Sequence, residues 1–169
     1  GEASRLSGLA VAKAPKALSL SKIHDLARGY DVVLCDGPPR LSDITRAAAV
    51  AADVVLVPLR AGGLDWWAVS ETLELLDSAD TIRAALGHPP VRRVFALNAV
   101  PAQHTNLKCN AVEAVAGLGD RAPIVVSNRV GFAEAVLSGE SPLTVQPSGA
   151  AAAEIRLLYA AVLGRTDAH

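Results

Sequence analysis

The sequence predicts an α/β fold, built as a mostly parallel sheet with helices on both of its faces. Two observations lead to this prediction. Apolar residues recur with helical spacing between short, continuous apolar runs, and an alternation of helices and strands is typical of crossovers between parallel strands. Continuous apolar strands are usually buried on both faces. The runs expected to form strands are Val32–Cys35, Val54–Leu59, Val94–Leu97 and Ile124–Val126.

Five of the expected helices begin at a residue suited to capping the N-terminus. The predicted caps are Ser21, Ser42, Asp65, Thr105 and Ser148. A shorter helix is expected over Phe132–Leu137, and Gly164 lies where the last helix should end. Helical spacing predicts an inner face for the first helix and for the long helix after Asp65. These faces comprise Ile23, Leu26, Ala27 and Tyr30 in the first, and Val69, Leu73, Leu76 and Leu86 in the second.

Length and composition suit one domain with a single core: the chain has 169 residues, of which 51% are apolar and 20% charged. No apolar run approaches the ~20 residues that a membrane span needs, and the first residues do not resemble a signal segment. The net charge of −1 provides no overall attraction to nucleic acid. Cys35 and Cys109 form no C-x-x-C pair, so both are expected to be small buried hydrophobes in a cytoplasmic protein.

Candidate functional residues follow the expected strands, because ligands bind at the carboxyl ends of parallel strands. Asp36 follows the first run, and the prolines behind it stiffen the loop that begins at Gly37. A fixed carboxylate there suits the sensing of a magnesium-bound nucleotide, although Asp36 could equally cap a turn. Asn98 ends the third run, where its amide could pair with the edge of adenine or simply form a turn.

In this order, the motifs resemble those of ParA/MinD-type P-loop ATPases. Tyr30–Pro39 is similar to their Walker B strand and switch II loop, which read aromatic-Asp, four apolar residues and Asp-x-Pro-Pro. The resemblance continues nearly to the end of the chain. Its further segments are Ala52–Pro58, Asp65–Leu75, Leu97–Val100, Arg129–Ala135 and Ala151–Ile155.

The resemblance implies a P-loop NTPase architecture and a role for several residues. Asp36 would be the catalytic Walker B acid, holding Mg²⁺ through a bound water. ATP would also meet the switch II residues Gly37, Pro38 and Pro39, and Asn98 would face its adenine. Asp65 and Trp66 would lie near the interface of a homodimer.

The family also implies partners and a biological role. Its members dimerise with ATP, bind DNA without sequence preference, and respond to a centromere-binding ParB-type protein; no membrane is implied. Such proteins partition plasmids or chromosomes. Lys108, Arg129 and Arg156 are candidate DNA contacts, and each could instead be a solvated surface charge.

One departure from the family is large: the printed residues contain no Lys-Gly-Gly-x-Gly-Lys loop and no strand leading into it. We therefore expect residues 1–169 to be a single ParA-like domain in truncated or incompletely recorded form, lacking the N-terminal strand and the P-loop. Phosphoryl transfer depends on positioning and electrostatics, so these residues alone should neither hydrolyse ATP nor bind it tightly. Alternatives are a natural pseudo-ATPase that acts as a binding module, a MinD-like ATPase that positions another cargo, and a related iron–sulfur reductase, which the expected placement of Cys35 within a strand disfavours.

Overall fold

A computed structural model describes residues 19–37, 42–60, 66–103, 105–119 and 123–164. These residues fall into two compact units. The first contains the described parts of 56–64 and 93–164, and the second contains those of 19–55 and 65–92. The two units are described separately below.

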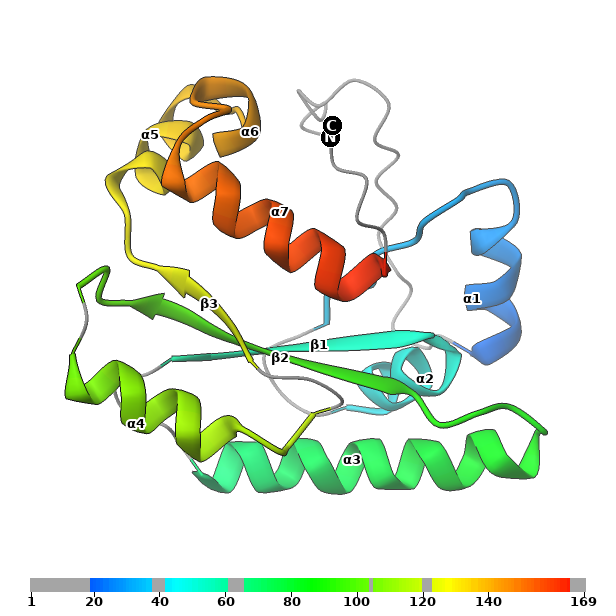
Figure 1. The fold of residues 1–169 in the computed structure, drawn as a ribbon. Helices are drawn as coiled ribbons and strands as arrows, with labels where there is room; N and C mark the ends of the chain where they lie inside the picture. Colours follow the sequence, from blue (N-terminus) through cyan, green and yellow to red (C-terminus); the bar gives the residue numbers. More distant parts are fainter. Residues whose placement is uncertain (1–18, 38–41, 61–65, 104, 120–122, 165–169) are drawn as a thin grey trace. The chain divides into compact units, whose positions relative to one another are not determined.

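The first unit is built on a three-stranded sheet in the order β1-β2-β3 (Figure 1). The strands are β1 (Val54–Arg60), β2 (Arg92–Val100) and β3 (Ile124–Ser127). β2 and β3 pair in parallel, and β2, the middle strand, is almost fully buried from Val94 to Leu97. Burial on both faces explains why this run is continuously apolar. The predicted α/β class and three of the four predicted strands are confirmed.

Four helices belong to the same unit: α4 (Asn106–Val115), α5 (Val130–Ser138), α6 (Pro142–Val145) and α7 (Ala150–Leu163). The hydroxyl of Thr105 caps α4, as predicted, by accepting from the Lys108 N–H at 3.2 Å. α7 packs against β3 and begins after Gly149 rather than Ser148. It ends at Gly164 in the left-handed conformation (φ 66°), which confirms the predicted stop signal.

The second unit contains α1 (Leu20–Ala27), α2 (Asp43–Ala51) and α3 (Trp66–Ala85), with α2 packed against both other helices. Ser42 caps α2 as predicted, and its hydroxyl accepts from the Thr45 N–H at 3.3 Å. The cap predicted for α1 was wrong by two residues. Ser19, not Ser21, accepts from the Lys22 N–H at 3.4 Å, so the helix begins one half-turn earlier. Within the described ranges, no helix combines the length and apolarity needed to cross a membrane.

The predicted inner faces are partly correct. Val69 and Leu76 are buried on α3, and Ile23 is buried on α1. Tyr30 and Leu86 are exposed instead, because each lies beyond the last turn of its helix, where helical spacing no longer applies. Leu26 is also exposed, because the eight-residue α1 buries only Ile23.

A buried arginine joins three parts of the second unit. Arg83 of α3 is 5% exposed and donates to three backbone carbonyls. Its Nη1 reaches the oxygens of Val50 at 2.8 Å and Ala52 at 2.7 Å, at the end of α2, and its Nε reaches that of Pro89 at 2.7 Å. These bonds fix the end of α2 and the chain after α3 to one side chain.

Residues Val32–Cys35 do not form the predicted strand. They are assigned to no helix or strand, and Val32, Val33 and Leu34 are 48%, 44% and 80% exposed. An apolar, β-branched composition favours a strand, yet a strand forms only where a neighbour completes its backbone ladder. No described strand pairs with this segment. The same exposure overturns the prediction for the cysteines, since Cys35 and Cys109 are both exposed.

Candidate functional site

The carboxyl end of β2 has an irregular backbone. The β2–β3 register shifts between Leu97 and Val100, and Ala99 has φ 54°, the sole positive value among the described residues other than glycine. The Asn98 Oδ1 accepts from the Ala99 N–H at 2.9 Å and so supports this conformation. Backbone strain of this kind is found preferentially at functional sites. This irregularity interrupts the hydrogen-bond ladder between β2 and β3 beside Asn98, the residue predicted to face the base.

A cavity of about 430 Å³ adjoins this irregularity, entirely within the first unit. Its volume lies in the range of small-molecule sites. Its lining is also typical of such sites, because it is mostly apolar with a few polar groups. The exposed amides of Asn98 and Asn128 supply polar groups from the ends of β2 and β3. The lining residues are Leu56, Pro58, Ala96, Asn98, Ala99, Val126, Ser127, Asn128, Phe132, Ile155 and Leu158.

One carboxylate organises the turn after β3. Glu154 of α7 accepts from the Ser127 N–H at 2.9 Å through Oε2. Its Oε1 accepts from both Nε and Nη2 of Arg129, each at 2.9 Å. Burial by itself raises the pKa of Glu154, but the hydrogen bonds from Arg129 and Ser127 outweigh it and hold the pKa below its ordinary value. Glu154 is therefore ionised at neutral pH and occupied by these two donors.

The arrangement is suited to binding rather than to proton transfer. Glu154 is the acidic residue of the group that it forms with Ser127 and Arg129, and it already accepts hydrogen bonds from both of them. Side-chain amides offer both a donor and an acceptor, and apolar walls accommodate the faces of a flat ring. A planar heterocycle with polar edges would use both features.

Asp36, the predicted magnesium residue, belongs to the second unit. It lies near the end of the described segment 19–37 and is exposed, as is Gly37. No group of three or more His, Cys, Asp or Glu able to hold a metal ion occurs in the part of the chain that the structure describes. A single carboxylate fits Mg²⁺ that keeps its waters and takes other ligands from phosphate. Pro38 and Pro39 lie outside the described residues.

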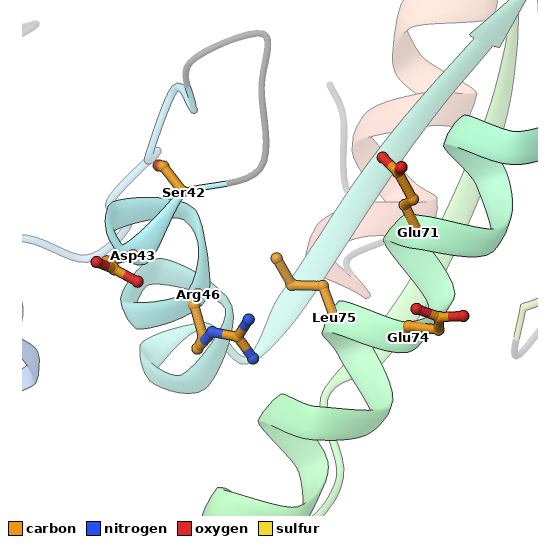
Figure 2. A pocket seen from close by; sticks show the side chains of 6 residues that line it. All are labelled: Ser42, Asp43, Arg46, Glu71, Glu74 and Leu75. Carbon is orange, nitrogen blue, oxygen red and sulfur yellow. The ribbon is translucent and has the colours of Figure 1, made fainter.

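A second cavity, of about 420 Å³, lies between α2 and α3 (Figure 2). Leu75 points from α3 into this space, and Arg46 approaches from α2, where its Nη1 donates to Ser78 Oγ at 2.7 Å. The carboxylates of Asp43, Glu71 and Glu74 give the lining a negative balance. The full lining is Ser42, Asp43, Arg46, Glu71, Glu74 and Leu75. None of the predicted site residues lines it.

The basic residues predicted to contact DNA differ in their hydrogen-bond partners and in their burial. Arg129 is bound to Glu154, and the Arg156 Nη1 donates to the Pro147 carbonyl at 2.7 Å. Lys108 lies half-buried in the first turn of α4. Of the predicted dimer residues, Trp66 begins α3, and Asp65 is outside the described residues.

The structure thus places one predicted residue, Asn98, at a cavity and adds two lining residues that the sequence reasoning missed, Ser127 and Asn128. It also adds Glu154, which does not line the cavity but accepts a hydrogen bond from Ser127. A signal for Glu154 was present. It is the sole acid within the fourteen residues of α7, in a stretch that is otherwise strongly apolar. An isolated acid of this kind usually has a buried partner.

Comparison with known proteins agrees with this reading of the fold. Residues 7–86 match a family described as an AAA domain. The chain is also 32% identical over 142 residues to the chromosome-partitioning ATPase Soj of Thermus thermophilus, an alignment that covers 82% of this chain and 55% of the relative. The chain therefore spans about half the length of the curated relative it matches. Together with the ordered motifs, these matches support the ParA/MinD-type family of P-loop ATPases as the family to which this chain belongs.

Proposed function

We propose that this chain provides the acidic, switch and base-facing parts of a ParA-like ATPase that partitions plasmid or chromosomal DNA. The observation that carries the proposal is the similarity to the partitioning ATPase Soj along 82% of the chain. The cofactors of the proposed activity are ATP and Mg²⁺. Its partners are a second copy of the chain, DNA bound without sequence preference, and a ParB-type centromere-binding protein.

Three parts of the chain have proposed roles toward the nucleotide. Asp36 holds a water of the magnesium ion, and the ion offsets the charge of the phosphates. Gly37 and the prolines that follow it respond to the γ-phosphate. Asn98 faces the adenine from the rim of the apolar cavity, where its amide can both donate and accept.

The roles at the protein and DNA surfaces depend on which side chains are available. Asp65 and Trp66 are proposed to lie near the dimer face. Of the three candidate DNA contacts, we favour Lys108, because Arg129 and Arg156 each donate to an acceptor of the protein itself. A lysine bound to a phosphate contributes affinity and salt dependence rather than sequence preference.

The proposal is tested with the protein that the gene encodes, after its intact mass and N-terminal sequence have been determined. We expect ATP-dependent retention of DNA and ATP hydrolysis that DNA and a ParB-type partner stimulate. Asp36→Ala should abolish hydrolysis with only a modest loss of ATP binding, because this side chain acts through the metal. Asp25→Ala is the matched control, since Asp25 is an exposed acid that forms a surface ion pair with Arg28 at 3.4 Å.

Unchanged turnover in Asp36→Ala would refute the role of that carboxylate. A wild-type protein whose DNA binding is indifferent to ATP would refute the partition function, and partner binding without any hydrolysis would identify a pseudo-ATPase. The printed 169 residues contain no Gly-Lys pair. We expect this segment alone to bind ATP more weakly than in the micromolar range, because the phosphate-binding loop normally contributes that pair.

A further inference from the structure

The contacts of Glu154 point to a role beyond the stability of α7. Its side chain is 13% exposed and stands in a helix that is otherwise rich in alanine and leucine. A carboxylate in such a place is costly unless donors surround it. The donors that do so are the Ser127 N–H and the guanidinium of Arg129, which lie on either side of one residue, Asn128.

The residue between these two anchors is the exposed one of the three, and it lines the cavity. Ser127 is 3% exposed and Arg129 is tied to Glu154 through two of its nitrogens, so both ends of the turn are fixed. Asn128, by contrast, is exposed and lines the 430 Å³ cavity together with Asn98. The hydrogen bonds from Ser127 and Arg129 to Glu154, called the clamp below, therefore leave the side chain of Asn128 exposed to a ligand.

A further hydrogen bond links this turn to the other amide. The Asn128 N–H donates to the Val100 carbonyl at 2.7 Å, across the bulge that holds Asn98. Hydrogen bonds thus connect Glu154, through Ser127 and Asn128, to Val100 at the end of the strand that carries Asn98. Fixing this turn beforehand matters, because a side chain that is ordered only on binding lowers affinity.

We propose that Glu154 is a positioning residue of the nucleotide site: by clamping Ser127 and Arg129 it holds the amide of Asn128 beside that of Asn98 at the cavity that receives the base. This inference rests on the proposed function, because it assumes that the base occupies this cavity. Glu154 itself does not touch the ligand.

The test uses the ¹⁵N-labelled protein that the gene encodes and adenosine, a probe without phosphates that reports on the base site alone. The side-chain NH₂ signals of Asn98 and Asn128 are followed by NMR with and without adenosine. The variants are Glu154→Ala, which removes the clamp, and Glu154→Gln, which keeps an acceptor for the Ser127 N–H. The matched control is Arg83→Met, which removes hydrogen bonds within the second unit and none to a residue that lines the cavity.

In the wild type we expect one set of Asn128 signals, which shifts with adenosine. Glu154→Ala should broaden or double these signals and raise the adenosine dissociation constant about three- to tenfold, since the turn must then be ordered on binding. The Asn128 signals and the adenosine dissociation constant of Glu154→Gln should lie between those of the wild type and those of Glu154→Ala. Arg83→Met should melt at a lower temperature yet retain the wild-type signals and affinity.

The outcomes separate the positioning role from the site itself. Wild-type signals and affinity in Glu154→Ala would overturn the role and leave the site in place. An equal disturbance in Arg83→Met would show general loosening and overturn the role as well. A wild-type chain whose two amides ignore adenosine would overturn the base site and, with it, the function assigned to Glu154.

Discussion

Replacing Arg83 by methionine should cost the second unit a large part of its stability. The change removes three hydrogen bonds of 2.7–2.8 Å from a charged donor to the carbonyls of Val50, Ala52 and Pro89. Bonds to a charged group contribute about 1.5–3 kcal/mol each, so simple addition gives about 4.5–9 kcal/mol. The three bonds share one side chain, so their losses are not additive, and we expect about 3–5 kcal/mol.

The assay is urea unfolding followed by far-UV circular dichroism. Arg83→Lys should retain part of the stability, because an ammonium can reach some of the carbonyls but does not reproduce the planar fork. Arg156→Ala is the control, since Arg156 makes a single exposed bond to Pro147 and its loss should cost less than about 1 kcal/mol. If Arg83→Met unfolds within about 1 kcal/mol of the wild type, the three carbonyls do not depend on this side chain and the reasoning is wrong.

Two further predictions concern the first unit. The pKa of Glu154 is lowered in the fold from its ordinary value of 4.5, so the carboxylate stabilises the fold above that pH and loses this contribution as the pH falls through the lowered value. The difference in unfolding free energy between the wild type and Glu154→Gln should therefore be constant above about pH 5 and shrink in acid; a constant difference at all pH values would contradict the assignment. Gly119→Ala should destabilise the unit by about 1–3 kcal/mol, because an added Cβ would lie 2.8 Å from both the Arg93 carbonyl oxygen and the Phe95 ring. Thermal melting measures this effect, and an unchanged melting temperature would show that the loop at Gly119 moves freely.

The fold class could be predicted because its signals are local. Val54–Leu59, Val94–Leu97 and Ile124–Val126 form strands, and their apolar runs are bounded by turn residues. Val32–Cys35 has the same composition and yet is not a strand. The difference is the presence of a pairing neighbour, which composition does not encode. For the same reason, helix caps that depend on one nearby hydroxyl, such as Ser42 and Thr105, were easier to predict than inner faces.

The site was only partly predictable because its contacts join distant parts of the chain. Asn98 was found because it ends a strand, which is a local property. The clamp on Asn128 joins Glu154 to residues 27 and 25 positions earlier. Spacings of that size have no characteristic pattern in a single sequence, so these partners emerge only when the fold brings α7 against β3.

The exposed segment Val32–Cys35 has a consequence for the behaviour of the protein in solution. An exposed apolar run that begins with two valines and contains no charge, proline or glycine can pair with strands of other molecules. Asp31 and Asp36 stand on either side of the run and act as gatekeepers, because like charges oppose stacking. Asp36→Ala removes one of the two gatekeepers as well as the proposed contact to the magnesium ion. The size distribution of that variant should accordingly be measured beside its turnover, since soluble aggregates would also abolish hydrolysis.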